Sequence, residues 1–410
     1  MRENQLKNLK ESFRILAERR AKITEDPLIG RLKETVKNIR ENSTRNLEKL
    51  LEKAEESFQD NDIEFYIAEN GEEANHIIYD IVKDERIIAK SKSNTLTEIN
   101  LVNFLEKKGL EVIETDLGDR IIQLTDDRPV HPTAPALHFN MQEIADIITE
   151  KLKVKVEANP EDIMETIKAD VLRKLENVKV GITGANAVAA YDGSIVMVHN
   201  EGNIGLLSLK DTHIIVFGID KLVGTLEDAI SVAKLETAYA TGSRVPSYIS
   251  VVSGPSKTAD IQKILLKNMY GPRRVVAIAL DNGRSKAPLE CLWCIGCGTC
   301  ITSCPIYNVV GYDFGYNGYL GGRGVAFTNF IEGERASFDA GIYMCTLCSR
   351  CTITCPLEIP IADIIEEVRC QVQRAGYRLD VHKNIIKNIK ETGTPFKGGN
   401  LKDSKWTSNV

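Results

Sequence analysis

Two runs of cysteines are the residues whose type and spacing most clearly indicate chemistry. Each run has the spacing C-x2-C-x2-C-x3-C-P, with three thiols at two-residue gaps and a fourth before a proline. The runs are Cys294, Cys297, Cys300 and Cys304, and then Cys345, Cys348, Cys351 and Cys355. Three evenly spaced thiolates can bind three corners of a cubane, while the fourth ligates the other cluster. The spacing therefore predicts two [4Fe–4S] clusters.

The two clusters are predicted to exchange their fourth ligands. Cluster one is then bound by Cys294, Cys297, Cys300 and Cys355, and cluster two by Cys345, Cys348, Cys351 and Cys304. A pair of zinc sites is the alternative, but zinc does not need a third evenly spaced cysteine followed by Cys-Pro in both runs. The two remaining cysteines are predicted to bind no cluster, Cys291 as a spare thiol and Cys370 as a buried packing residue.

The composition is that of a globular protein, with 43% hydrophobic and 27% charged residues in a chain of 410. A net charge of −6 argues against a general nucleic-acid binder. No apolar run approaches the roughly 18 residues of a membrane span, so we expect no membrane span. The chain starts with the polar residues Met1-Arg2-Glu3-Asn4, which predicts no signal peptide and a cytoplasmic location.

The sequence divides into four regions that must position these cysteines. Residues 1–60 are rich in Lys, Arg and Glu with apolar residues at helical spacing, which predicts two or three amphipathic helices, a charged helical arm that packs on the next domain or on a partner. Residues 61–284 alternate between short apolar runs and helical stretches, which is typical of an α/β domain with a largely parallel sheet. Residues 285–396 form the cysteine-rich module, and 397–410 a polar tail.

The elements of the α/β domain are predicted from the same alternation. Strands are expected at residues 64–68, 86–89, 111–114, 178–183, 194–199, 212–218, 247–253 and 274–280. Helices are expected at residues 72–82, 97–108, 141–152, 163–177, 225–240 and 259–268.

A Lys/Ser loop in the α/β domain is the candidate binding site for an anion. Lys90-Ser91-Lys92-Ser93 follows a predicted strand and precedes a helix, so hydroxyl, ammonium and backbone N–H groups meet there. Further polar or glycine residues at strand or helix ends join this tentative site: Gly184, Asn186, Glu201, Gly202 and Asn203. Plain turns are the alternative for the glycines.

His199 is the weak candidate for a general base, since imidazole titrates near neutral pH, although a lone histidine at a strand end is more often structural. The motifs GxGxxG, P-loop and HExxH are absent from the sequence, whereas a flavin site is left open.

Several segments of the α/β region resemble the LUD domain of lactate utilisation proteins. They are Lys90–Ser93, Gly181–Asn186, Gly193–Val196, Asn200–Asn203 and Leu280–Arg284. The forty residues between the cysteine runs, with helices on both sides, resemble the α-helical dicluster ferredoxin of the heterodisulfide reductase small subunit. The chain as a whole, from roughly residue 25 to 396, is similar to the LUD-domain iron–sulfur proteins of L-lactate oxidation.

This resemblance implies a fold, a function and partners. It implies a LUD domain similar to sugar-phosphate isomerases and CoA transferases, and electron transfer in the oxidation of L-lactate or another 2-hydroxy acid. The alternatives are an anion or CoA-ester binding or transferring LUD enzyme with redox-sensing clusters, and an electron carrier in heterodisulfide reductase-like chemistry. The implied partners are a CCG-domain subunit and a second LUD subunit. The CCG-domain subunit is expected to dock at the C-terminal end, which comprises the helix that bears Ile385, Ile386 and Ile389 and the tail from Gly393 to Val410.

Overall fold

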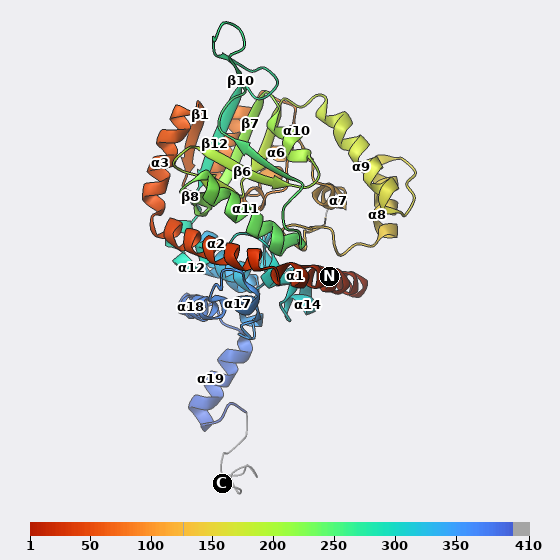
Figure 1. The fold of residues 1–410 in the computed structure, drawn as a ribbon. Helices are drawn as coiled ribbons and strands as arrows, with labels where there is room; N and C mark the ends of the chain where they lie inside the picture. Colours follow the sequence, from red (N-terminus) through yellow and green to blue (C-terminus); the bar gives the residue numbers. More distant parts are fainter. Residues whose placement is uncertain (126, 397–410) are drawn as a thin grey trace.

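A six-stranded parallel sheet forms the centre of the molecule (Figure 1), and the computed structural model describes residues 1–125 and 127–396. Its strand order is β1-β12-β7-β4-β2-β3, and every neighbouring pair is parallel. The strands are β1 (Ile63–Ala68), β12 (Arg274–Leu280), β7 (Thr212–Gly218), β4 (Val180–Gly184), β2 (Ile87–Lys90) and β3 (Glu111–Glu114). The central strands are apolar on both faces because other elements cover each face. The parallel α/β core predicted from the alternation is confirmed.

A second sheet of four strands packs against one face of the first, and the sequence did not predict it. Its order is β8-β5-β6-β9, with antiparallel pairing of β6 to both β5 and β9. The strands are β8 (Leu222–Val223), β5 (Ala187–Ala189), β6 (Ser194–His199) and β9 (Tyr248–Val252). The strands predicted at 194–199 and 247–253 therefore exist, but they lie outside the parallel sheet. Periodicity indicates a strand without indicating which sheet it joins.

Helices cover both faces of the parallel sheet. They are α4 (Gly71–Val82), α5 (Asn94–Glu98), α6 (Leu101–Lys107), α7 (Leu117–Thr125), α8 (Met141–Leu152), α9 (Pro160–Leu175), α10 (Asn203–Ser208) and α11 (Leu226–Thr241). One buried cluster joins α4, α5 and α6 to one face of the sheet, and another joins α8, α9 and α10 to the side of β2 and β3. The helix α11 begins with a capping box between Thr225 and Asp228.

Two of the predicted helices differ from the structure. The helix expected at 97–108 is divided into α5 and α6, because Asn100 has a positive φ of 53° that no helix can continue through. The helix expected at 259–268 is wrong, since this segment is a hairpin of β10 (Lys257–Thr258) and β11 (Leu266–Lys267). The apolar residues that suggested a helix there, Ile261, Ile264 and Leu265, are more than half exposed and cover no core.

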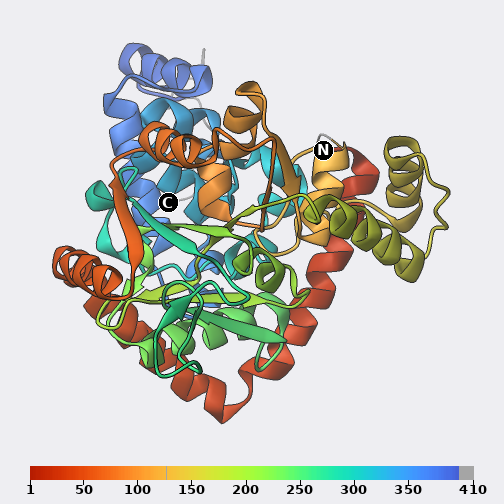
Figure 2. The same ribbon diagram turned by 90° about the horizontal axis from the view of Figure 1, so that it is seen from above.

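The N-terminal arm consists of three helices, as predicted: α1 (Glu3–Thr24), α2 (Pro27–Arg45) and α3 (Leu47–Asp60). Figure 2 shows α1 and α2 meeting at a bend, where Asp26 caps α2 and Pro27 occupies its first position. The helix α3 packs on β1, whereas α1 and α2 pack on α11 and on the cysteine-rich module. One continuous buried cluster joins α1, α2, the second sheet and that module. The arm is therefore part of the core.

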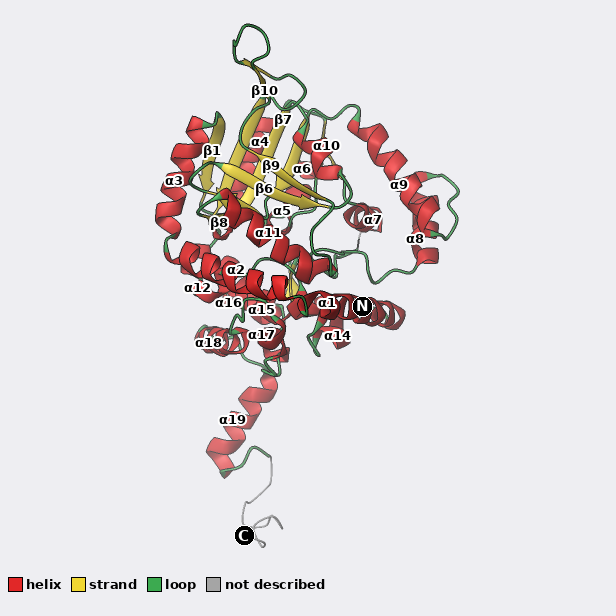
Figure 3. Cartoon of the chain, viewed as in Figure 1, coloured by secondary structure: helices red, strands yellow, loops and turns green. Residues whose placement is uncertain are grey.

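The cysteine-rich module is helical and lies beneath the sheets (Figures 1 and 3). Its helices are α12 (Leu289–Leu292), α13 (Thr299–Thr302), α14 (Tyr307–Val310), α15 (Gly321–Ile331), α16 (Glu334–Asp339), α17 (Arg350–Thr354) and α18 (Ile361–Arg374). The module also contains the 3-10 helices η3 (Gly311–Asp313) and η4 (Ile342–Met344), and a small hairpin of β13 (Gly315–Tyr316) and β14 (Tyr319–Leu320).

Two further 3-10 helices precede the module: η1 (Ile219–Lys221) lies within the α/β domain, and η2 (Arg284–Lys286) lies at the junction of the two.

The last described helix, α19 (Asp380–Thr392), projects away from the body and buries none of its residues (Figure 1). The tail predicted at 397–410 lies outside the described residues. Among the helices that the structure describes, none has both the length and the apolar character needed to cross a bilayer.

Candidate functional site

Each cysteine run is an irregular loop that ends in a short helix. In the first run, Gly296 and Gly298 have positive φ angles of 82° and 73°, and α13 follows. In the second run, Leu347 and Ser349 occupy the equivalent positions with φ of 56° and 58°, and α17 follows. Both loops therefore have the same left-handed turns, although glycine provides them only in the first.

These turns place backbone N–H groups near the cysteine sulfurs. The N–H of Gly296 lies 3.4 Å from Cys294 Sγ, and the N–H of Leu347 lies 3.4 Å from Cys345 Sγ. The Tyr307 N–H approaches Cys304 Sγ at 3.5 Å. Donors of this kind stabilise thiolate charge and tune the potential of a bound cluster.

The structure brings one crossed set of thiols together in a cavity and places Cys355 near the other set. Cys304 lines one cavity together with Cys345, Cys348 and Cys351, although forty residues separate the runs. Burial and the neighbouring Cys355 raise the pKa of Cys297 to about 12, so Cys355 lies with the first run. The helices α13 and α17, which carry the ends of the two loops, pack against each other.

The thiols of the two runs fit an iron–sulfur group. Burial raises the pKa of Cys351 and of Cys355 to about 11, so a bound metal is needed to release their protons near neutral pH. Within residues 1–125 and 127–396, no group of three or more His, Cys, Asp or Glu side chains is placed to hold a single metal ion. The second set instead surrounds a shared space, as ligands at the corners of a larger group would.

The two remaining cysteines differ in their surroundings. Cys291 is buried, and burial raises its pKa to about 12. Cys370 lies on α18 and is exposed, so the prediction that it is a buried packing residue is wrong. It falls on the outer face of an amphipathic helix whose inner face is formed by Ile361, Ile364, Ile365 and Val368.

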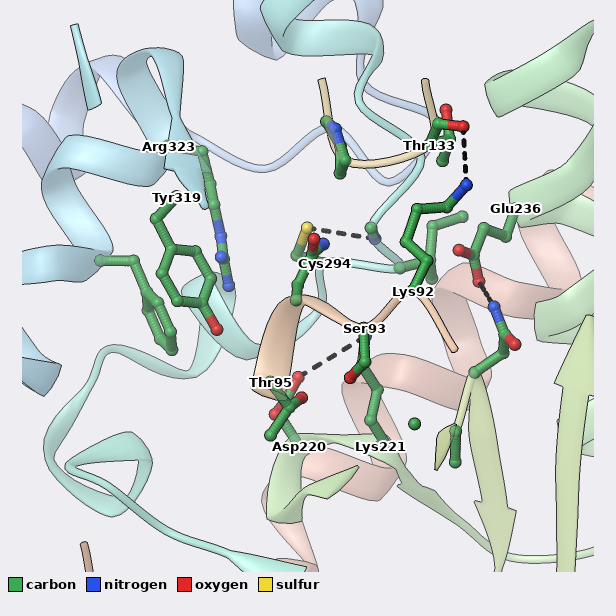
Figure 4. A pocket seen from close by; sticks show the side chains of 18 of the residues that line it. Lys92, Ser93, Thr95, Thr133, Asp220, Lys221, Glu236, Cys294, Tyr319 and Arg323 are labelled. Carbon is green, nitrogen blue, oxygen red and sulfur yellow. Dashed lines mark hydrogen bonds and ion pairs between the residues drawn. The ribbon is translucent and has the colours of Figure 1, made fainter. Parts of the chain in front are cut away.

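A cavity of about 190 Å³ lies between the LUD-like domain and the first cysteine loop (Figure 4). Cys294 lies near its middle, with Arg323 and Tyr319 on one side and Lys92 and Glu236 on the other. Ser93, Gly184 and Asn186 also line it, as do Ile295 and Gly296. A ligand in this cavity would touch a residue predicted to bind cluster one.

A second cavity of about 170 Å³ adjoins the first and shares Lys92, Thr133, Ile204 and Glu236 with it. Ser91, His199, Glu201 and Asn203 line this second cavity. Glu201 accepts a hydrogen bond from the Leu117 N–H at 3.0 Å, and Asn203 Nδ2 lies 3.3 Å from Thr115 Oγ1. Gly202, with φ of 87°, caps α10 and lines neither cavity.

The two lysines of the Lys/Ser loop already have carboxylate partners, which the prediction did not include. Lys90 is in register with Glu114 on β3, and its Nζ lies 2.7 and 2.8 Å from the two carboxylate oxygens. Its side chain faces a third cavity, away from the first two. Lys92 Nζ lies 2.7 Å from Asp116 and 3.1 Å from the Thr133 carbonyl oxygen. Ser93 caps α5. Anion binding by this loop stays a prediction.

His199 is held by its neighbours at the wall of the second cavity. Its Nε2 lies 2.9 Å from Ser250 Oγ, its ring stacks on Tyr248 at 5.0 Å, and burial lowers its pKa. The neutral imidazole is therefore favoured near pH 7. A role as general base stays a prediction.

The sequence did not indicate three charged residues of the first cavity. Glu236 on α11 is partly exposed to both cavities, accepts a hydrogen bond from Asn186 Nδ2 at 2.8 Å, and has a pKa raised by burial. Lys221 lies 3.9 Å from Asp220, and Arg323 stacks on Phe327 at 4.1 Å. The only sequence signal for Glu236 is a carboxylate at a helix position whose neighbours Ala233, Thr237 and Ala240 are buried.

Family models match two parts of the chain. A model described as the LUD domain matches residues 51–280, and one described as a 4Fe-4S dicluster domain matches residues 290–359.

Curated relatives match most of the chain. Lactate utilization protein B of Bacillus subtilis is 32% identical over 379 residues, which is 90% of this chain and 77% of that protein. Lactate utilization protein B of a Geobacillus species is 35% identical over 352 residues, 82% of this chain and 71% of that protein. A crystal structure of a DUF162 family protein from Deinococcus radiodurans aligns with a TM-score of 0.31 at 14% identity, over 57% of this chain and 98% of that one.

Proposed function

Because the chain belongs to the lactate utilization protein B family of LUD-domain iron–sulfur proteins, we propose that it conducts electrons released from L-lactate or another 2-hydroxy acid. Two [4Fe–4S] clusters, bound by the crossed sets of cysteines, carry these electrons. The observation that supports this proposal most is the cavity of about 190 Å³ that Cys294 and the LUD domain line together. A donor bound there lies against a ligand of cluster one.

The charges of the cavity suit a small carboxylic acid. Arg284 and Lys92 are paired with carboxylates, while Lys221 has only a long contact with Asp220, and Arg323 donates to the Cys291 carbonyl oxygen. Lys221 and Arg323 thus remain to bind a substrate carboxylate. Glu236 lies across the cavity and can accept the hydroxyl proton. Oxidation of a 2-hydroxy acid to a 2-oxo acid removes the hydroxyl proton, which Glu236 can take, and a hydride from Cα, which must pass to a two-electron carrier of the redox partner. That carrier can then reduce the two cubanes by one electron each.

The central test is reduction of the clusters by substrate. We expect the anaerobically purified protein to contain about eight iron atoms per chain. We expect L-lactate to bleach its thiolate-to-iron absorption when the protein is assembled with its redox partners. The Glu236→Gln variant should be reduced more slowly by L-lactate, because it lacks a proton acceptor, and normally by dithionite.

Stoichiometric zinc without visible absorption would contradict the iron–sulfur assignment. Full iron without any reduction by L-lactate or other 2-hydroxy acids would contradict the proposed donor. That second result would favour an anion or CoA-ester binding LUD enzyme with sensing clusters, or a carrier in heterodisulfide reductase-like chemistry.

Cluster two and α19 are the proposed exit for electrons. Cys348 is exposed, as are Met344 and Ile353 beside the second loop. The helix α19 presents Ile385, Ile386 and Ile389 to solvent, with exposed fractions of 37, 37 and 48%. An apolar helix face with no buried residue in the described part of the chain is typical of a docking site. We propose that a CCG-domain subunit binds there, and a second LUD subunit is the other proposed partner.

Charge on α19 should disrupt this docking. We expect an Ile386→Glu, Ile389→Glu variant to lose co-purification with the CCG-domain subunit, because burying two carboxylates in an apolar contact is costly. A Lys383→Glu variant on the same helix is the matched control for added charge. Retention of the complex by the double variant, with both clusters present, would show that α19 is not the docking element.

A further inference from the structure

Two buried arginines of the N-terminal arm reach the loop predicted to bind cluster one. Arg20 on α1 is 8% exposed and Arg40 on α2 is 1% exposed. Arg20 donates from Nε to the Tyr239 carbonyl oxygen at 2.8 Å and from Nη1 to Thr302 Oγ1 at 3.2 Å. Arg40 donates to the carbonyl oxygens of Leu292 and Trp293, the two residues before Cys294.

The contacts of Arg20 lead directly to the cysteines. The Tyr239 carbonyl oxygen that Arg20 contacts also accepts a hydrogen bond from Thr299 Oγ1 at 3.3 Å. The same Thr299 Oγ1 lies 3.3 Å from Cys297 Sγ. Thr302, the other partner of Arg20, lies on α13 between Cys300 and Cys304. Arg20 is therefore linked to the Cys297 thiol through two intervening residues, Tyr239 and Thr299.

Arg323 on α15 also lies beside this loop, on the same side of the cavity as Tyr319 (Figure 4). Its Nη2 donates to the Cys291 carbonyl oxygen at 3.0 Å, and its guanidinium stacks on Phe327. The Nε atom is buried and has no hydrogen-bond partner among the described residues. The thiol with the strongest electrostatic effect on this guanidinium is that of Cys294.

These three arginines differ from Arg120 and Arg284 in what neutralises them. Arg120 and Arg284 are about as buried as Arg20 and Arg40, and each forms an ion pair of 2.6 to 2.7 Å with carboxylates. In the described part of the chain, Arg20, Arg40 and Arg323 form no such ion pair and donate to carbonyl and hydroxyl oxygens. A buried charge without a counter-charge is strongly unfavourable. Anionic thiolates next to the three guanidinium groups would supply that counter-charge.

We propose that Arg20, Arg40 and Arg323 form a cationic shell that raises the reduction potential of cluster one. The inference rests on the proposed ligation of cluster one by Cys294, Cys297, Cys300 and Cys355. A cubane with four thiolates is anionic and gains a further negative charge on reduction, so nearby fixed cations favour the reduced state. The N-terminal arm thereby makes cluster one a better acceptor for electrons that leave the adjoining cavity.

Removal of one cation should lower that potential. In an electron paramagnetic resonance redox titration of the full chain, Arg20→Gln is expected to shift the one-electron equilibrium of cluster one about tenfold toward the oxidised state, about 59 mV. The signal of cluster two should keep its potential. Arg20→Lys, which keeps the charge, should stay within about twofold of the wild type. Arg120 is buried and contacts Gln123 and Asp170 of the LUD domain, so Arg120→Gln is the matched control and should shift neither cluster.

Each outcome of this experiment decides the proposal. An unchanged potential of cluster one in Arg20→Gln with full iron content would overturn it. If Arg20→Gln loses iron, the half-buried Arg323→Gln is titrated instead, with the same expected shift and the same overturning result. A tenfold shift in Arg20→Lys would also overturn it, since the charge is retained there. Absence of iron from the wild type would instead contradict the proposed function.

Discussion

Replacing Cys355 by serine is expected to remove the cluster bound by Cys294, Cys297 and Cys300 and to leave the other cluster in place. Iron should fall from about eight to about four atoms per chain. The reason is that Cys355, although it belongs to the second run, lies with the thiols of the first. Electron paramagnetic resonance of the reduced protein measures which of the two signals is lost.

The backbone around Cys355 stabilises a thiolate at this position. Backbone N–H groups of Leu357, Glu358 and Ile359 point toward its sulfur and oppose the rise in pKa that burial causes. Glu358 is in turn bound by Lys33 and Lys37 of α2, both at 2.7 Å. A serine at this position loses the soft donor that iron prefers, while the loop keeps its anchors.

Three other cysteine variants complete the test. Cys304→Ser should remove the cluster of Cys345, Cys348 and Cys351, because Cys304 lines their cavity. Cys291→Ser and Cys370→Ser should keep all the iron, since neither thiol belongs to a crossed set. If Cys355→Ser instead perturbs only the signal of its own run, the crossed ligation is wrong.

The cysteine spacing and the strands could be predicted from sequence because both depend on short-range patterns. The two C-x2-C-x2-C-x3-C-P runs indicate the cluster module, and the apolar runs at 111–114, 212–218 and 274–280 coincide with β3, β7 and β12. The match of the LUD and dicluster models to successive parts of the chain confirms the predicted family.

Only part of the cavity wall could be predicted, namely Lys92, Ser93, Gly184 and Asn186. Lys221, Glu236 and Arg323 come from distant segments, and no local spacing relates them to the Lys/Ser loop. The role of the arm was missed for the same reason, since Arg20 is 282 residues away from Thr302 in sequence. The partners of Lys90 and Lys92 depend on the register of β2 and β3, which places Glu114 opposite Lys90.

The second large effect is expected on stability, from the replacement of Arg284 by glutamine. Arg284 is 3% exposed and donates to both oxygens of Glu98, at 2.9 and 2.7 Å, and to Asp220 at 2.7 Å. Its Nη2 also lies 3.1 Å from the Tyr319 hydroxyl. Glu98 is on α5, Asp220 on η1 and Tyr319 on β14, so the network joins the LUD domain to the cysteine-rich module.

Loss of Arg284 leaves two buried carboxylates without their main cation. Removing one partner of a buried ion pair costs about 3–5 kcal/mol, because the remaining charge stays desolvated. Burial alone would raise the pKa of Asp220, but Lys221 and Arg284 lower it from its usual 3.8 to about 2. Ionised Asp220 therefore stabilises the fold fully above about pH 4, and this contribution is lost as the pH falls toward 2. In Arg284→Gln, the part of the free energy of unfolding that is lost on acidification should be smaller than in the wild type.

Arg274→Gln is the matched control for this prediction. Arg274 also binds a carboxylate through two nitrogens, both 2.7 Å from Glu64, but the two side chains are 37% and 44% exposed. An exposed pair contributes about 0–1 kcal/mol to stability, so this variant should unfold almost as the wild type does. Anaerobic urea unfolding followed by circular dichroism measures both variants, at neutral pH and as the pH falls from 4 toward 2. If Arg284→Gln is no less stable than Arg274→Gln, the buried network does not hold the two parts of the chain together.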